Sequence, residues 1–275
     1  MLRFSATVSA DALASLFSRD EPEGLAEMKH IVSFSGGKDS TAMLLMMIER
    51  GMKIDDIIYF DCGDWEFPQM AEHIRQVEEY IGRQITRLYP SRGDLNYWMF
   101  DYKPKPRKGN TPQIGKAWPG PTFRWCTGRK TEAIEKYQRQ YKAEGMISYI
   151  GFAADEINRM IRPNISSRWY ETRFPLYDFD MTETDCMEYC YSKGFTWGGL
   201  YNHFKRVSCW CCPLQPLREL KQLYLHFPEL WARLRDMDER AWNTFRADGK
   251  SVEDLEKRFY FEEVQQGKLK LGGMA

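Results

Sequence analysis

Ser35-Gly36-Gly37-Lys38-Asp39-Ser40 is the stretch that decides how this chain folds. It follows a short apolar run that ends at Phe34, and it precedes a helix-forming run, Thr41–Arg50. This order predicts a strand, a tight glycine turn and a helix. Glycine lets the backbone approach an anion, and the amides of a first helical turn attract negative charge. The sequence therefore predicts a phosphate-binding loop, to which the lysine adds a full charge and the serines add hydroxyl donors.

The loop differs from the Walker A motif, which has a glycine and a Ser or Thr where this chain has Val32 and Asp39. It resembles the PP-loop of the ATP pyrophosphatase superfamily, which splits ATP into AMP and pyrophosphate. The alternative is a glycine-rich turn in an ordinary α/β domain. The residues that we expect to bind nucleotide are Ser33, Ser35, Gly36, Gly37, Lys38, Asp39, Ser40, Asp61 and Gly151. Catalysis is assigned to Lys38, Asp39 and Asp61.

Composition limits the class of protein. The chain has 275 residues, of which 43% are apolar, enough for one domain or for one domain with an appendage. Its 39 basic and 39 acidic residues cancel, so no overall charge indicates a nucleic-acid partner. No stretch is long enough to span a membrane, and no signal-peptide pattern is present. We expect a cytoplasmic protein without a membrane partner, whose seven cysteines are metal ligands or thiols rather than disulfides.

Short apolar strands alternate with helices through residues 29–215, the expected nucleotide-binding domain. The predicted strands are Ile31–Phe34, Ile57–Phe60, Ile85–Leu88, Ile147–Ile150 and Arg173–Leu176. The predicted helices are Thr41–Arg50, Pro68–Ile81, Arg129–Ala143 and Glu183–Lys193. The pattern predicts an α/β fold with a doubly wound, mostly parallel five-stranded sheet, which the PP-loop resemblance identifies as adenine nucleotide alpha hydrolase-like. Ligands of such sheets lie at the carboxyl ends of the strands.

The two ends of the chain show a different pattern. Residues 1–28 are expected to form a polar lead-in with one short helix, Asp11–Ser18. Residues 216–275 are expected to form a helical appendage, because apolar residues there recur at helical spacing and no further strand pattern is found. Its predicted helices are Leu217–His226, Glu229–Arg246 and Val252–Gln265.

Three segments, two of which follow predicted strands, resemble the phosphoadenosine phosphosulfate (PAPS) reductase family, a branch of the PP-loop group. They are Asp61–Pro68, Arg124–Lys130 and Gly151–Arg159. The resemblance implies that substrate or phosphate is held by Arg124, Arg129, Lys130, Glu156 and Arg159. The chain departs from the family pattern at Cys62, Ala153 and Ile157, where the family has Thr, Arg and Ser. The alternatives are a polar loop that caps a helix and, for Glu156 with Arg159, an ion pair on a helix surface.

The segment Lys103–Lys130 holds eight basic residues and no acidic one, and its first part is rich in proline. A long irregular loop in a compact domain is usually functional or disordered. We interpret it as a flap over an anionic substrate, with Trp118 and Trp125 available to stack on bases. The alternative is a solvated basic loop.

Three cysteines lie within four positions, Cys209-Trp210-Cys211-Cys212, and Cys209 and Cys212 have the spacing of a metal-binding pair. The PAPS reductase resemblance adds Cys126 as a third ligand, and Cys211 is a candidate fourth. Such thiolates suit a [4Fe–4S] cluster or zinc. The resemblance favours iron, because adenylyl-sulfate reductases and the sulfur-transfer members carry such clusters. Packed or redox-active thiols are the remaining alternative, and Cys62 is expected only to pack.

These features together favour an ATP-dependent adenylating enzyme that uses Mg²⁺ and releases pyrophosphate. The resemblance to the iron–sulfur members implies sulfur transfer from a donor protein to an anionic or nucleic-acid acceptor. The second hypothesis is a PAPS or adenylyl-sulfate reductase. Lys38 suits a triphosphate, and no cysteine follows Cys212, whereas the family's reductases have a C-terminal nucleophilic thiol. The third hypothesis is a non-enzymatic, metal-stabilised nucleic-acid-binding protein.

Overall fold

The computed structural model describes residues 28–106, 112–161 and 169–267, so the expected helix at Asp11–Ser18 lies outside the described residues. Five strands of the described chain form one sheet in the order β3-β2-β1-β4-β5, and every neighbouring pair is parallel. The strands are β1 (Lys29–Phe34), β2 (Asp56–Phe60), β3 (Thr86–Leu88), β4 (Met146–Ile150) and β5 (Glu171–Arg173). The predicted doubly wound α/β fold is therefore confirmed.

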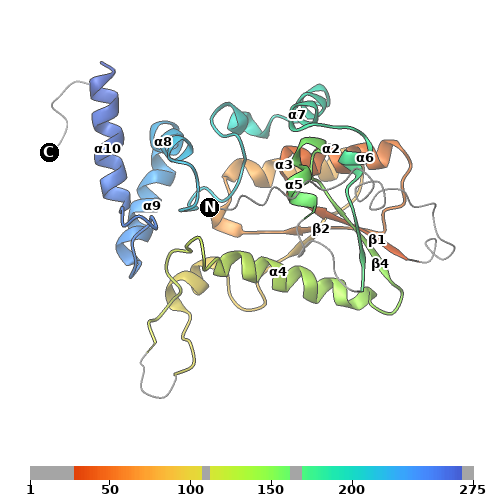
Figure 1. Cartoon of the computed structure of the whole chain (residues 1–275), viewed down its shortest axis with the longest axis horizontal. Helices are drawn as coiled ribbons and strands as arrows, with labels where there is room; N and C mark the ends of the chain where they lie inside the picture. Colours follow the sequence, from red (N-terminus) through yellow and green to blue (C-terminus); the bar gives the residue numbers. More distant parts are fainter. Residues whose placement is uncertain (1–27, 107–111, 162–168, 268–275) are drawn as a thin grey trace, which may run out of the picture.

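Helices cover both faces of the sheet (Figure 1). Successive strand residues point to opposite faces, and Ile31 packs toward α4 (Trp125–Gln138) while Val32 packs toward α2 (Lys38–Glu49). The helices α3 (Pro68–Ile81) and α7 (Glu183–Ser192) lie on the same side as α2. Each fully buried large apolar side chain contributes about 1.5–3 kcal/mol, so both faces need a helical cover.

The strand order leaves a crevice beside β1. The chain leaves β1 through α2 on one face and enters β4 through α4 on the other, so the connections diverge between these two strands. Ser33 of β1 pairs in register with Ile150 of β4. The residues that follow the two strands, Ser35 and Gly151, therefore lie together at the carboxyl edge of the sheet.

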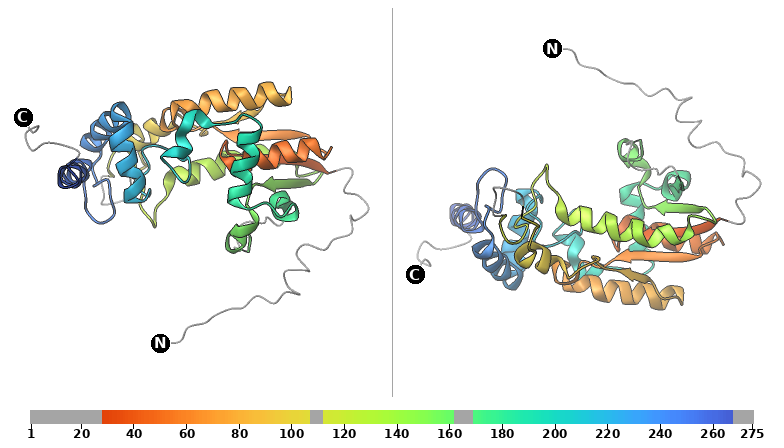
Figure 2. Two further views of the ribbon diagram at one scale, coloured as in Figure 1. Left: turned by 90° about the horizontal axis from the view of Figure 1, so that it is seen from above. Right: turned by 90° about the horizontal axis from the view of Figure 1, so that it is seen from below.

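The helices α8 (Leu217–His226), α9 (Pro228–Arg240) and α10 (Val252–Gln265) gather at one end of the molecule (Figures 1 and 2). Their apolar faces meet, and the rings of Trp231 and Phe259 lie 5.9 Å apart. Trp118 connects this group to the loop before α4, because its indole N–H donates to Asp238 Oδ1 at 2.8 Å. The expected C-terminal helices are thus present.

Several element boundaries differ from the predicted ones. α9 ends at Arg240 instead of Arg246, because the Asn243 side chain pairs with both the N–H and the C=O of Trp118 at 2.8 and 3.0 Å. The fifth strand ends at Arg173, and Pro175 opens α6 (Pro175–Asp178), since its fixed φ suits a first helical turn. α4 begins four residues earlier than predicted, at Trp125.

Several short elements had no counterpart among the predicted ones. A π-helical turn covers Tyr97–Asp101, and α5 (Ile157–Met160) follows a short 3-10 turn after β4. None of the helices in the described part of the chain combines the length and the apolar character that crossing a membrane requires.

Candidate functional site

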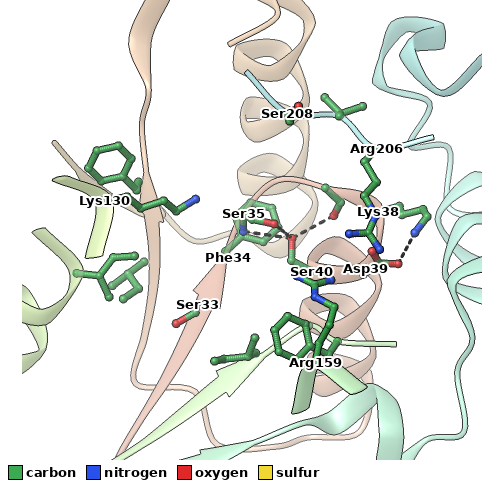
Figure 3. Close-up of a pocket in the computed structure, with 18 of the residues that line it drawn as sticks. Ser33, Phe34, Ser35, Lys38, Asp39, Ser40, Lys130, Arg159, Arg206 and Ser208 are labelled. Carbon is green, nitrogen blue, oxygen red and sulfur yellow. Dashed lines mark hydrogen bonds and ion pairs between the residues drawn. The ribbon is translucent and has the colours of Figure 1, made fainter. Parts of the chain in front are cut away.

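The phosphate loop joins β1 directly to α2, which begins at Lys38 rather than at Thr41. The Ser40 hydroxyl accepts the Ser35 N–H at 3.2 Å, lies 3.0 Å from the Ser35 hydroxyl and donates to the Gly37 carbonyl at 3.0 Å (Figure 3). The two serines, expected as donors to a ligand, therefore first hold the loop in shape. Because Lys38, Asp39 and Ser40 form the first turn of α2, their amides lie at the positive end of its dipole.

Two glycines permit close approaches around the loop. Gly36 has a φ of +73°, and a Cβ atom there would lie 2.7 Å from Met70 Cε. Gly151 follows β4, and a Cβ atom there would lie 2.9 Å from the Cα and 3.0 Å from the N of Ser40. The end of β4 thus lies against the first turn of α2, and only glycine fits without displacing backbone atoms.

Aromatic side chains from segments far away in the sequence contact the phosphate loop and the first turn of α2. Trp197 donates its indole N–H to the Gly36 carbonyl at 2.7 Å and stacks on His73 with ring centroids 4.4 Å apart. His73 Nε2 lies 3.0 Å from Thr41 Oγ1, and burial lowers the pKa of His73 to about 3. The Tyr201 hydroxyl accepts the Lys38 N–H at 2.8 Å. Sequence reasoning missed these residues, because nothing in their local patterns connects them with the loop.

Lys38 is only 5% exposed, and carboxylates surround its ammonium group. Its Nζ lies 2.7 Å from Asp39 Oδ1 and 3.6 Å from Glu183 Oε2. Burial raises the pKa of Asp39, and the Lys38 ammonium opposes this shift. Glu183, in the first turn of α7, belongs to this site although the sequence analysis did not select it.

A second set of ion pairs borders the loop. Arg206 donates to Glu156 Oε1 at 2.6 Å and to Glu183 Oε1 at 2.8 Å, and Arg159 lies 2.5 Å from Glu156 Oε1. The ion pair of Glu156 and Arg159, the alternative to a substrate-binding role, is therefore present, but Glu156 is buried and both residues belong to a larger network that reaches the phosphate loop. Arg206, which directly precedes the cysteine segment, was not among the predicted site residues.

A pocket of about 430 Å³ opens over the loop at the carboxyl edge of the sheet. Its charged lining consists of five basic side chains and one carboxylate: Lys38, Lys130, Arg159, Lys205, Arg206 and Asp39. Figure 3 shows Lys130 and Arg206 reaching toward the loop from different elements. The excess of positive charge suits a polyphosphate, and apolar residues such as Ile58, Phe60 and Phe152 offer a surface for a base.

A second cavity, of about 240 Å³, adjoins this pocket and is lined by Cys62, Cys126 and Cys209. The two spaces share part of their walls, namely Ser35, Phe60, Lys130, Val207 and Ser208. Burial raises the pKa of Cys126, and the charge of Cys212 adds to that shift. Cys212 does not line the cavity itself, but its N–H donates to the carbonyl of Cys209, a lining residue, at 3.1 Å. Cys211 is fully buried and does not line the cavity.

The donor chemistry of this cavity fits an iron–sulfur cluster. Thiolates are the ligands of such clusters, and each cysteine binds a different iron, so the sulfurs surround a space instead of meeting at one ion. Neighbouring buried thiols cannot all ionise without a compensating cation. Within residues 28–106, 112–161 and 169–267, no three His, Cys, Asp or Glu side chains are placed so as to hold a metal ion.

Other predicted site residues lie farther from the loop. Asp61 accepts the Gly63 N–H at 2.7 Å and does not line the phosphate pocket. Arg124 and Arg129 line a separate pocket, where Arg129 lies 4.4 Å from the ring centre of Trp98. Of the basic residues predicted in this segment, Lys130 reaches both the phosphate pocket and the cysteine cavity.

The prediction that two tryptophans of the basic segment can stack on bases is wrong. Trp118 and Trp125 are 2% and 6% exposed, and the Trp125 indole donates to the Ala117 carbonyl at 3.0 Å. Both rings are part of the hydrophobic core. Trp118 connects the segment to α9, and Trp125 is the first residue of α4. Phe123, at 55% exposure, is an accessible aromatic residue near them. Arg107 and Lys108 lie outside the described residues.

Comparison with known proteins gives a matching family, a curated relative and, among the solved structures, one with a weak overall likeness. The profile of the phosphoadenosine phosphosulfate reductase domain matches residues 29–215. "Uncharacterized protein MJ0066" of Methanocaldococcus jannaschii is 26% identical over 210 residues, which are 74% of this chain and 40% of that protein. The chain thus spans less than half of that relative. The U34-tRNA thiolase NcsA from Methanococcus maripaludis, solved with its [4Fe–4S] cluster, aligns over 90% of this chain and 76% of its own, with 11% identity and a TM-score of 0.40.

Proposed function

We propose that this chain, which belongs to the phosphoadenosine phosphosulfate reductase domain family, is an ATP-dependent adenylating enzyme that prepares an anionic or nucleic-acid acceptor for sulfur transfer. One observation carries the proposal: the phosphate-loop pocket and the cysteine cavity share Ser35, Lys130 and Ser208 in their walls. Adenylation of the acceptor needs a pocket that binds ATP, and the transfer of sulfur needs a neighbouring space that is lined by thiols. A phosphate-binding protein without sulfur chemistry would not need the second.

In the first step an acceptor oxygen attacks the α-phosphorus of ATP. A bond forms between that oxygen and phosphorus, the bond to the bridging oxygen of pyrophosphate breaks, and pyrophosphate leaves with the electron pair. The acceptor proton passes to water. Lys38, Arg206 and the first turn of α2 stabilise the charge that develops on the phosphates. Asp39 is the carboxylate in the pocket lining that can bind the Mg²⁺ of the nucleotide.

In the second step a hydrosulfide from a sulfur-donor protein attacks the acceptor atom to which the adenylylated oxygen is bound. A bond to sulfur forms, the bond to oxygen breaks, and AMP leaves with the electron pair. Lys130, which lines both spaces, is placed to stabilise the leaving phosphate. An iron–sulfur cluster, when bound, supplies iron that can hold sulfur, and Cys126, Cys209 and Cys212 are the residues to bind it.

The test compares two nucleotides. The purified protein is incubated with ATP, Mg²⁺ and bulk tRNA or sheared DNA as acceptor probes, and separately with PAPS and reduced thioredoxin. We expect pyrophosphate from ATP, no sulfite from PAPS, and pyrophosphate release that is at least about 100-fold slower from a Lys38→Met variant. Sulfite from PAPS would overturn the proposal in favour of a reductase. Nucleic-acid binding without turnover of either nucleotide would overturn it in favour of a binding protein.

A further inference from the structure

We propose that Cys62, and not Cys211, is the fourth thiolate of the iron–sulfur site. Cys62 lies in the loop after β2 and lines the cavity together with Cys126 and Cys209, whereas neither Cys211 nor Cys212 is part of its lining. Cys212 is kept as the third ligand beside Cys126 and Cys209 because its side chain is partly exposed and its N–H donates to the Cys209 carbonyl, whereas Cys211 is fully buried. The inference rests on the proposed function only in assuming that a cluster is bound. It reverses the expectation that Cys62 merely packs.

Two hydrogen bonds of Trp210 hold the loop that carries Cys62 against the segment that carries Cys209. The Trp210 N–H donates to the Trp65 carbonyl at 3.0 Å, and the Trp210 indole N–H donates to the Asp64 carbonyl at 2.7 Å. Trp210 directly follows Cys209, and both tryptophans are at most 2% exposed. The loop that carries Cys62 is therefore fixed beside Cys209 by buried backbone contacts.

A third contact connects the same loop to the beginning of α4. The Trp65 and Trp125 rings meet edge to face with centroids 5.7 Å apart, and Trp125 directly precedes Cys126. Trp65 thus touches the neighbours of two cysteines that the sequence analysis had selected. Three segments from different parts of the chain meet here, and each brings one thiol to the cavity.

The surroundings of Cys62 agree with a ligand role. The Cys62 and Cys209 side chains line the same cavity. Glu66, which also lines the cavity, is bound by the Tyr59 hydroxyl. Within the described part of the chain, the cavity lining includes three thiols, one carboxylate and the Lys130 ammonium.

A fourth protein thiolate changes the chemistry of the site. With three cysteine ligands one iron of a four-iron cluster keeps an open position, and with four every iron has a protein ligand. The iron that could hold sulfur in the proposed function is then already bound by Cys62, so the hydrosulfide of the second step is not held on iron. It enters the cavity freely and is positioned there by polar wall residues such as Lys130 and Ser208.

The experiment compares single cysteine variants of the full chain, prepared anaerobically. Iron and sulfide per chain are measured together with the electron paramagnetic resonance spectrum after mild oxidation. We expect about four irons in the wild type, about three or fewer in Cys62→Ala with a three-iron signal, and wild-type values in Cys211→Ala. Cys186→Ala is the matched control, because Cys186 is also a free cysteine but does not line the cavity.

The outcomes separate this inference from the proposed function. A wild type without iron would overturn both the inference and the cluster that the proposed function includes. A wild type with four irons and an unchanged Cys62→Ala would overturn the inference alone, and iron loss in a folded Cys211→Ala would do the same. Thermal unfolding of each variant, and Cys62→Ser as a second substitution, separate loss of a ligand from loss of the fold.

Discussion

Gly151→Ala tests whether the close contact between β4 and α2 builds the phosphate loop. The new Cβ atom would lie 2.9 Å from Ser40 Cα, 3.0 Å from Ser40 N and 3.2 Å from the carbonyl carbon of Asp39. These are backbone atoms in the first turn of a buried helix, so they cannot rotate away as a side-chain end could. Overpacking typically costs about 1–3 kcal/mol, and we expect about 2–3 kcal/mol because backbone must move.

The same displacement moves the amides and the lysine that are proposed to hold the phosphates. A misplacement of about 1 Å can reduce a rate about 100-fold, and the shift here is smaller. We therefore expect kcat/KM for pyrophosphate release by Gly151→Ala to fall by about tenfold or more.

Urea denaturation at constant m-value measures the stability, and a coupled pyrophosphate assay measures the activity. Gly128→Ala is the matched control, because Gly128 is exposed inside α4 and a Cβ atom there meets nothing within 4 Å. The same substitution should raise stability there by up to about 1 kcal/mol. A Gly151→Ala protein with wild-type stability and full activity would refute the reasoning.

Three further predictions concern charge, pH and capping. Lys38→Met should lower pyrophosphate release by about 100- to 1,000-fold in a coupled assay, and full activity would exclude the phosphate role. The substitution also leaves the Asp39 carboxylate without its cation, so adding Asp39→Asn should restore the lost stability but not the activity. Burial lowers the pKa of His73 to about 3, so its contribution to stability is present above pH about 6.5 and is lost as the pH falls toward 3. Between pH about 6.5 and 3, the free energy of unfolding measured by urea titration should fall less in His73→Gln than in the wild type. Equal decreases in the two proteins would contradict this prediction. Thr182→Ala removes the cap that accepts the Asp185 N–H at 3.2 Å, and it should lower the unfolding free energy by about 1 kcal/mol in thermal denaturation; an unchanged midpoint would argue against the cap.

The fold could be predicted because its signals are local. α3 and α8 have the predicted bounds, since Pro68 and Pro216 mark their beginnings and an apolar face runs along each. The boundaries that differ depend on distant contacts. α9 ends early because Asn243 pairs with Trp118, which is 125 residues away in the chain.

The part of the candidate site that follows a strand in sequence could be predicted from the strand order. The phosphate loop and Gly151 follow β1 and β4, so the carboxyl-edge rule brought them together. Glu183, Arg206 and Tyr201 reach the loop from other segments, and their own neighbourhoods carry no phosphate-binding pattern.

The sequence by itself determined the strand–loop–helix unit at Ser35–Ser40, because glycine conformation, helix dipole and lysine charge act over a few residues. It also supplied the thiols without showing which of them meet. Only the tertiary structure decided that Cys62 lies in the cavity and Cys211 outside it. The physical reason is that buried contacts of Trp65 and Trp210 bring together three segments that are far apart in the chain.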